Sequence, residues 1–262
     1  MQTNSFPIGI FDSGVGGTSI WREIINLLPL ENTIYLSDSL NAPYGEKSKQ
    51  EIIDLSVKNT ELLLQKGCKL IVVACNTATT NAIKVLRNRY KIPFIGIEPA
   101  IKPAAFHTKR NTIGILATKG TLNSELFEKT SGTINEKIIR KEIVGKGLVE
   151  LIETGKLHSN EMTNLLTSYI LPLKDNIDCL VLGCTHYPYL IPQIQEIVGE
   201  NVKIIDSGEA VARQTRTVLE KFKLLNNNSN EPFHQFFINK NKTILKQILP
   251  PNITVTVTEQ NF

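Results

Sequence analysis

Short apolar runs alternate with longer amphipathic stretches along most of the chain. The runs are rich in β-branched residues and are bounded by Gly, Asn, Asp or Thr. They predict strands at residues 7–11, 33–36, 69–74, 93–97, 112–116, 179–183 and 202–206. Helical spacing lies between them, at residues 18–28, 48–66, 78–90, 122–129, 162–173, 189–198 and 210–222. This alternation is typical of an α/β fold with mostly parallel sheets flanked by helices.

The two halves of the chain resemble each other in three places. IGIFDS at residues 8–13 matches IGILAT at 113–118, LIVVACNT at 70–77 matches LVLGCTH at 180–186, and residues 94–97 match 203–206 more weakly. The three matches occur in the same order in both halves and are separated by nearly the same number of residues. We therefore expect two similar lobes, residues 1–98 and 99–209. The active site is then expected in the cleft between them.

The last part of the chain begins with the linker-like composition NNNSNEP at residues 226–232. A strand is predicted at residues 234–239, a short helix at 242–249 and an alternating strand at 253–258. We expect residues 210–262 to pack back on the first lobe.

Composition and charge exclude several classes of protein. With 41% hydrophobic and 21% charged residues, the chain has the balance of a globular protein. Its net charge of +4 comes from basic and acidic residues mixed along the sequence, which does not indicate a nucleic-acid partner. The N-terminal residues do not read as a signal peptide, and no run of about 18 apolar residues predicts a membrane span.

The number and positions of the cysteines limit the kinds of site that the chain can form. They are Cys68, Cys75, Cys179 and Cys184. Their number and spacing fit neither a disulfide framework nor a metal site, so we expect a reducing cytoplasm and no bound metal. Cys68 and Cys179 begin or precede strands and are expected to fill the core.

Cys75 and Cys184 each follow a predicted strand, where ligand sites of α/β folds lie. Each is followed by hydroxyl or amide residues, in Cys-Asn-Thr and Cys-Thr-His. A helix N-terminus favours a thiolate and lowers a thiol pKa from about 8.5. Two thiols facing each other across a cleft could remove a proton from one side of a carbon and deliver one to the other, which is racemisation or epimerisation.

Two further motifs accompany the thiols. DSGVGGT at residues 12–18 has glycines that allow a backbone to approach a ligand, but lacks the dinucleotide fingerprint and the phosphate-loop lysine. Asp12 either accepts a proton from a nearby thiol or caps the following helix. His186 either activates Cys184 or shapes the turn. The remaining histidines, His107, His158 and His234, are expected at the surface or in packing.

With these motifs the sequence resembles the glutamate racemases of the aspartate/glutamate racemase superfamily. The resemblance runs over residues 7–215 through GIFDSGVGG, NAPYGEKS, VACNTATT, GIEPA, ATKGT, GCTHYP and DSGEA. It implies a two-lobed fold, a buried site between the lobes, no cofactor, and interconversion of L- and D-glutamate that supplies D-glutamate for peptidoglycan.

Matching motif positions imply roles for individual residues. Cys75 and Cys184 would be the catalytic thiols, assisted by Asp12 and His186, with Glu153 as the glutamate near the second thiol. The substrate-binding residues would be Asp12, Ser13, Pro43, Tyr44, Gly45, Cys75, Asn76, Thr77, Thr118, Thr121, Cys184, Thr185 and His186.

Parts of this assignment are open. The sequence departs from the family pattern at residues 144–153, which leaves Glu150 as an alternative to Glu153. Asp38 matches the acidic residue ahead of the Pro-Tyr-Gly loop. Racemisation of aspartate or another amino acid, and a non-catalytic binding or sensor protein on the same scaffold, remain alternatives. We expect a small-molecule substrate, a cytoplasmic location and no membrane or nucleic-acid partner. A homodimer is one assembly that the chain could form.

Overall fold

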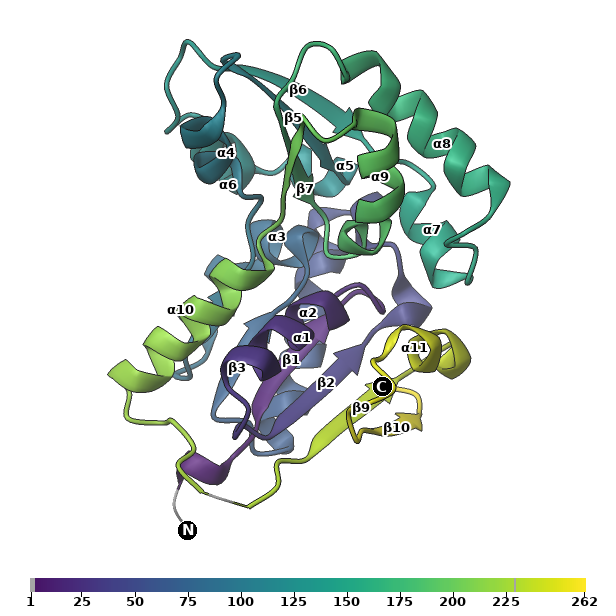
Figure 1. Cartoon of the computed structure of the whole chain (residues 1–262). Coiled ribbons are helices and arrows are strands. Elements are labelled where there is room, and N and C mark those ends of the chain that lie inside the picture. Colours follow the sequence, from purple (N-terminus) through teal and green to yellow (C-terminus); the bar gives the residue numbers. More distant parts are fainter. Residues whose placement is uncertain (1–2, 229) are drawn as a thin grey trace.

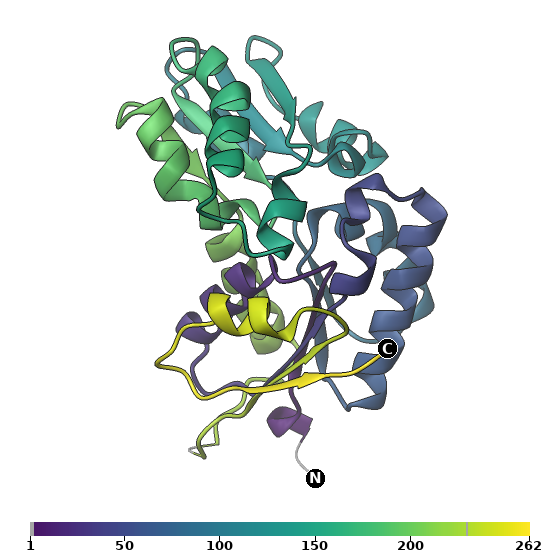
Figure 2. The ribbon, with the colours of Figure 1, turned by 90° about the vertical axis from the view of Figure 1, so that its right-hand side faces the viewer.

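The structure, a computed structural model, describes residues 3–228 and 230–262. Its strands form two parallel sheets, one in each of two stacked lobes (Figures 1 and 2). The first sheet has the order β10-β9-β2-β1-β3-β4, formed by β1 (Ile8–Asp12), β2 (Thr33–Ser37), β3 (Leu70–Val73), β4 (Phe94–Gly96), β9 (His234–Ile238) and β10 (Thr256–Glu259). The second has the order β6-β5-β7-β8, formed by β5 (Thr112–Ala117), β6 (Ile139–Val144), β7 (Cys179–Gly183) and β8 (Lys203–Ile205). The predicted α/β fold class is confirmed.

Helices connect the strands within and between the lobes. Those of the first part of the chain are α1 (Thr18–Leu27), α2 (Lys49–Gln65), α3 (Asn76–Arg89) and α4 (Ile101–His107). Those that follow are α5 (Lys119–Leu122), α6 (Glu125–Ser131), α7 (Leu148–Glu153), α8 (Asn160–Ile170), α9 (Ile191–Val198), α10 (Gly208–Lys221) and α11 (Lys242–Ile248). Short 3-10 turns lie at Thr3–Ser5, Ser39–Asn41, Tyr44–Glu46, Leu171–Leu173 and Tyr187–Leu190.

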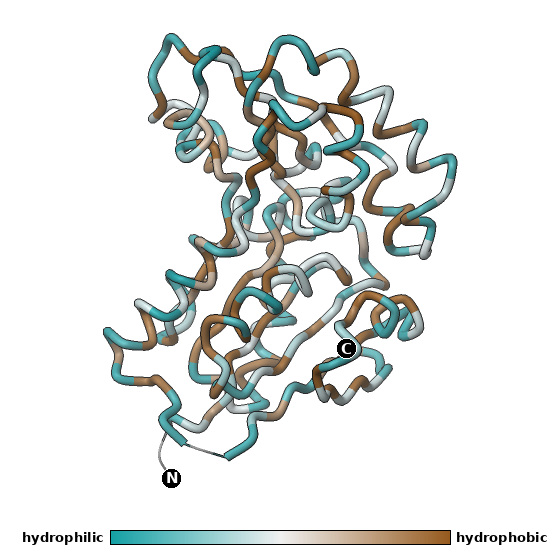
Figure 3. Tube along the Cα trace, in the orientation of Figure 1, coloured by the Kyte–Doolittle hydropathy of each residue, from teal (hydrophilic) through white to brown (hydrophobic). Residues whose placement is uncertain are grey.

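Helices cover both faces of the first sheet because successive strand residues point to opposite sides. Leu70 and Val72 of β3 belong to one apolar cluster with Trp21 of α1, whereas Ile71 and Val73 belong to another with residues of α2 and α3. Figure 3 shows the apolar colouring along these strands, with hydrophilic residues more frequent on the surrounding loops. The all-apolar runs of the sequence are therefore strands buried on both faces.

The first apolar cluster continues from one lobe into the other. Leu180 and Leu182 of β7 lie in it together with Ile8 and Ile10 of β1. Two segments connect the lobes, and a hydrogen bond joins them. The Ser207 hydroxyl donates it to the Glu98 carbonyl at 2.5 Å. The lobes consequently share packing as well as covalent connections.

The C-terminal segment adds to the first sheet. β9 pairs in parallel with β2, β10 pairs in parallel with β9, and α10 packs along α1. In Figure 1 this yellow-green segment runs beside the purple N-terminal strands. The division of the chain at residues 98 and 99 stays a prediction.

Some elements differ from those expected. β6 and α7 were not anticipated, since the residues of β6 are exposed or half-buried and carry little apolar periodicity. The helix expected at 122–129 is two helices, because Ser124 accepts a hydrogen bond from the Phe127 N–H and begins α6 there. In the described part of the chain, no helix is long and apolar enough to cross a membrane.

Candidate active site

A small closed cavity lies where the carboxyl ends of strands from both lobes meet. Its lining comprises Ser13, Pro43, Tyr44, Gly45, Cys75, Asn76, Thr77, Thr118, Val149, Cys184, Thr185 and His186. Its volume of about 10 Å³ is room for roughly one water molecule. The structure thus brings both strand-end thiols to one cavity.

Cys75 lies at the N-terminus of α3, as the sequence predicted. Its sulfur accepts a hydrogen bond from the Ala78 N–H at 3.4 Å, and Ser13 Oγ lies 3.6 Å away. Burial raises the pKa of the Cys75 thiol, and the negative charge of Asp12 raises it further. The expectation of a lowered thiol pKa is therefore wrong for this residue, because burial outweighs the donors at the helix terminus.

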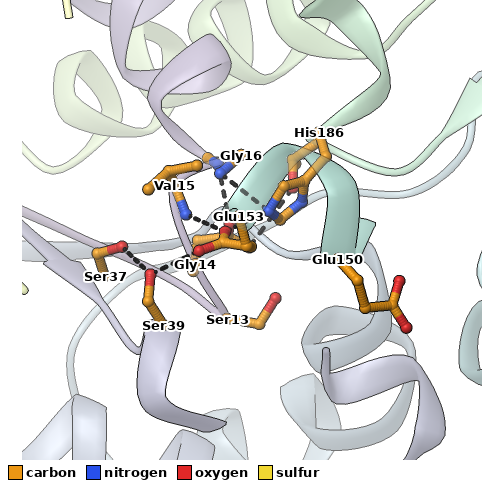
Figure 4. Close-up of polar contacts among 12 residues, drawn as sticks. Ser13, Gly14, Val15, Gly16, Ser37, Ser39, Glu150, Glu153 and His186 are labelled. Carbon is orange, nitrogen blue, oxygen red and sulfur yellow. Dashed lines mark hydrogen bonds and ion pairs between the residues drawn. The ribbon is translucent and has the colours of Figure 1, made fainter. Parts of the chain in front are cut away.

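Cys184 has a different environment. It follows β7, but the next element is a 3-10 turn rather than an α-helix, so its main polar partner is a side chain. His186 Nδ1 lies 3.7 Å from its sulfur, and His186 Nε2 lies 2.6 Å from Glu153 Oε1. These contacts form a chain from thiol to imidazole to carboxylate (Figure 4 shows its His186–Glu153 end).

The contacts of the His186 imidazole favour its charged form. Burial by itself lowers the pKa of His186, but contacts with Cys184 and Glu153 outweigh it and raise that pKa well above its usual range. In the imidazolium both nitrogens donate, Nδ1 towards the sulfur and Nε2 towards the carboxylate. The Gly16 N–H lies 3.3 Å from Nε2 and donates a hydrogen bond to it when that nitrogen carries no proton (Figure 4).

The two candidate glutamates on α7 occupy different environments. Glu153 is buried, and its Oε1 also accepts a hydrogen bond from the Val15 N–H at 2.6 Å. Glu150 is exposed, and in Figure 4 its side chain points away from His186. Of the two carboxylates, the structure brings only Glu153 to the imidazole.

Asp12 is fully buried at the end of β1. Its carboxylate accepts hydrogen bonds from the Gly17 N–H at 2.8 Å and from the Thr185 hydroxyl at 3.4 Å. Burial raises the pKa of Asp12 to about 6, although the nearby His186 lowers it. Its influence on Cys75 is electrostatic, and its hydrogen bond to Gly17 steadies the glycine-rich loop before α1.

The glycines of that loop also shape the contact between the lobes. A β-carbon at Gly14 would overlap the Glu153 carboxylate, and one at Gly16 would overlap the His186 ring. Both positions therefore make room for buried side chains of the opposite lobe. The loop is a contact between lobes as well as part of the site.

An unsatisfied amide and a group of hydroxyls border the cavity. Neither side-chain polar atom of Asn76, which is buried, has a hydrogen-bond partner. Thr77 Oγ1 lies 2.8 Å from Thr118 Oγ1 and 3.2 Å from Thr121 Oγ1, joining the lobes. Because a buried polar group without a partner is costly, the Asn76 amide fits a site that a polar ligand completes.

The Pro43-Tyr44-Gly45 loop is supported from behind by Asp38. The Tyr44 hydroxyl and the Asn239 amide donate to its carboxylate at 2.5 and 2.6 Å. Asp38 is fully buried and outside the cavity lining. Its role in the structure is to hold the loop, with help from the C-terminal segment.

Other expected residues lie as follows. Asp12, Thr121 and Glu153 are buried beside the cavity without lining it, whereas Val149 lines it and was not anticipated. Cys68 and Cys179 lie in apolar clusters. His107 is exposed, and His234 packs against Trp21.

Sequence reasoning also missed Ser39. Its hydroxyl donates a 2.8 Å hydrogen bond to Glu153 Oε2. Its position soon after β2, beside Asp38, was the available signal, because the residues after the strands of a parallel sheet gather at one edge.

A larger cavity of about 800 Å³ lies beside the site, and Lys84, Arg87 and Lys129 are among its lining residues. Neither thiol lines it. We assign the chemistry to the small cavity because the buried ionisable groups with displaced pKa values converge there. Among the described residues, no cluster of three or more His, Cys, Asp or Glu is arranged to hold a metal ion.

Comparisons with known proteins agree with this geometry. The family model described as Asp/Glu/Hydantoin racemase matches residues 14–215. The glutamate racemase of Herpetosiphon aurantiacus is 47% identical over 84% of this chain and 87% of its own length. That of Ralstonia pickettii is 48% identical over 79% of this chain and 74% of its own.

Solved structures extend the similarity to nearly the whole chain. A glutamate racemase isoform of Bacillus anthracis has a TM-score of 0.87 at 33% identity, with 98% of each chain covered. The glutamate racemase of Francisella tularensis, determined in complex with D-glutamate, has a TM-score of 0.84 at 28% identity, again with 98% of each chain covered.

Proposed function

Because the chain belongs to the Asp/Glu/Hydantoin racemase family, we propose that it interconverts L-glutamate and D-glutamate by proton transfer at Cα between two thiols. The observation that carries this proposal is that Cys75 and Cys184, from opposite lobes, border one closed cavity. The activity supplies D-glutamate for peptidoglycan synthesis.

The reaction exchanges one proton for another on opposite faces of one carbon. A thiolate removes the Cα proton and becomes a thiol, while the thiol on the other side gives its proton to Cα and becomes a thiolate. His186 lies 3.7 Å from the Cys184 sulfur and can pass a proton to it or take one from it, whereas burial raises the pKa of the Cys75 thiol. One turnover exchanges the protonation states of the two sulfurs.

Glu153 keeps the proton on His186 when Cys184 is the thiolate. The short contact between the two side chains favours a charged pair in this buried setting. Asp12 acts on the opposite side, where its charge raises the pKa of Cys75 and makes the Cys75 thiolate a stronger base. The two thiols are thus supported by different groups.

The substrate is held by polar groups rather than by buried cationic side chains. The N-terminus of α3 and the unpartnered Asn76 amide suit a carboxylate. The hydroxyls of Ser13, Thr77, Thr118 and Thr185, with the Pro43-Tyr44-Gly45 loop, complete the contacts. Such donors, fixed in a cleft that excludes water, stabilise charge that develops as the Cα proton leaves.

The lobes open to admit glutamate and close around it. A cavity of about 10 Å³ cannot hold an amino acid, so the form described is the closed one. The proton transfers then take place away from solvent, where fixed hydrogen bonds act most strongly.

Glutamate is the small-molecule partner of the chain. A cytoplasmic location agrees with the four free cysteines. A homodimeric assembly stays a proposal, and sedimentation of the purified protein tests it.

A direct experiment tests the function. The purified chain, without added cofactor, is incubated with L-glutamate or D-glutamate in D₂O, and the enantiomers and Cα deuterium are measured. We expect each enantiomer to yield the other with deuterium at Cα. Absence of interconversion contradicts the proposal, and faster turnover of aspartate in the same assay assigns a different substrate.

A further inference from the structure

Both carboxylate oxygens of Glu153 are held from the opposite lobe. Oε1 accepts the Val15 N–H at 2.6 Å, and Oε2 accepts the Ser39 hydroxyl at 2.8 Å. Val15 follows β1 and Ser39 follows β2, whereas Glu153 ends α7 of the second lobe. The carboxylate that contacts His186 is therefore completed only when the lobes meet (Figure 4).

The Ser39 hydroxyl is placed for this contact by its neighbours. It is 5% exposed and lies 3.1 Å from the Ser37 hydroxyl. The preceding Asp38 accepts hydrogen bonds from Asn41 and Asn239. These bonds fix the 3-10 turn that begins at Ser39 and leave its side chain directed at the carboxylate.

Hydrogen bonds to a carboxylate favour its charged form, because an anion accepts them more strongly than a neutral acid does. An anionic Glu153 keeps a proton on His186, and an imidazolium donates to Cys184. If Oε2 lost its donor, the buried carboxylate would compete more strongly for that proton. The proton would then move from His186 towards Glu153.

We propose that Ser39 is a positioning residue for the racemase reaction, which donates across the lobe boundary to Glu153 and thereby holds the proton on His186 beside Cys184. The role in catalysis rests on the proposed function. The effect on the proton does not, since it concerns the protein without substrate.

The titratable groups that face His186 come from three elements. Their arrangement allows the effect of Ser39 on the His186 proton to be separated from other effects. Cys184 follows β7, Glu153 ends α7 and Asp12 ends β1. Ser39 contacts only Glu153 among these groups. A change at Ser39 therefore reaches the imidazole through one carboxylate.

The test follows the imidazole nitrogens of the full chain by nitrogen-15 NMR during a pH titration, with His186 assigned by the loss of its signals in His186→Gln. In the unchanged protein we expect imidazolium signals from His186 to persist well above the pH range in which an ordinary histidine loses its proton. Ser39→Ala is expected to lower the titration midpoint by about one pH unit or more, a tenfold loss of proton affinity.

Activity gives the second measurement. We expect kcat/KM for glutamate to fall roughly 10- to 100-fold in Ser39→Ala, with its pH profile shifted in the same direction as the titration. Ser39→Thr keeps a hydroxyl and should restore both. Ser56→Ala is the matched control, because this buried hydroxyl donates to the Ile52 carbonyl within α2 rather than to Glu153.

The outcomes separate the proposal from the proposed function. An unchanged His186 titration in Ser39→Ala overturns the positioning role, even if activity falls. A shifted titration in a protein that does not racemise glutamate supports the proton-holding role and contradicts the function. If Ser39→Ala does not fold, Ser39→Cys keeps the side-chain volume with a weaker donor and carries the same expectations.

Discussion

The carboxylate of Glu153 lies against the Cα of Gly14 and leaves no space for a β-carbon there. Gly14 belongs to the loop after β1, and Glu153 ends α7 of the opposite lobe. The Glu153 carboxylate thus occupies the space that a side chain at position 14 would need. The packing between the lobes therefore positions Glu153, which contacts His186, which in turn contacts Cys184.

Replacing Gly14 by Ala should displace Glu153 and impair the reaction more than the fold. We expect kcat/KM to fall at least about 100-fold, since a misplaced group in an active site costs of this order. The matched control is Gly132→Ala, where an added β-carbon meets neighbours only at ordinary contact distance and activity should be unchanged. Equal activities of the two variants would show that closure does not need this contact.

The two thiols can be distinguished by exchange at Cα. Cys75→Ser and Cys184→Ser should each lower racemisation at least about 1,000-fold, because a serine hydroxyl is a far weaker proton donor and base at neutral pH. Each variant keeps the thiol on one face, so in D₂O we expect each to exchange the Cα proton of one enantiomer only, and of opposite enantiomers.

Cys179→Ser controls for the loss of a buried thiol, because Cys179 is 2% exposed and lies outside the cavity. It should retain racemase activity. Full racemisation by either single variant at Cys75 or Cys184 is the result that would remove the two-thiol mechanism.

The Asn76 amide should affect binding and stability in opposite ways. Its buried oxygen and nitrogen have no partner in the ligand-free protein, so Asn76→Ala should leave the free energy of unfolding unchanged or raise it. Loss of a hydrogen bond to a charged substrate should raise KM for glutamate roughly 10- to 100-fold.

Asn81→Ala provides the contrast. Its amide donates to the carbonyls of Thr77 and Gly120 at 2.9 and 3.2 Å, so this variant should be destabilised by about 1 kcal/mol. Urea unfolding and initial-rate kinetics on both variants check the two predictions. A stability loss at Asn76 equal to that at Asn81 would indicate that the Asn76 amide has a structural partner.

Asp12 should make the protein less stable as the pH rises. Its pKa is about 6 in the folded protein and 3.8 in an unperturbed side chain, so the folded state binds more protons between these values. Protonation of Asp12 therefore stabilises the folded state in full below pH 3.8. This contribution, about 3 kcal/mol in all, is lost as the pH rises through about 6.

Asp12→Asn removes this titration while keeping the shape of the side chain. Its stability relative to the unchanged protein should rise by about 2.5 kcal/mol between about pH 4 and pH 7.5, measured by urea unfolding. Asp178→Asn should change in the opposite direction and at lower pH, because its stabilising effect is present above about pH 4 and is lost as the pH falls below 3.8. There, partial burial is outweighed by hydrogen bonds from Thr108 and from the N–H groups of Lys109 and Arg110, which lower the pKa of Asp178. A flat difference for Asp12→Asn contradicts the raised pKa.

Much of the molecule could be read from local patterns. The apolar runs became strands buried on both faces, and the cysteines that follow two of them reached one cavity, because the ends of parallel strands gather at one edge. β6 was missed because an exposed strand at the edge of a sheet needs few apolar residues, so its sequence carries no periodic signal.

What the sequence by itself determined was the fold class, the order along the chain of the strands other than β6, and the cysteines that lie just after β3 and β7. Only the tertiary structure placed Glu153 rather than Glu150 against His186, brought Ser39 to that carboxylate, and raised rather than lowered the pKa of Cys75. The reason is physical. A residue's secondary structure depends mainly on its neighbours in the chain, whereas its charge state depends on burial and on groups that folding brings from far along the sequence.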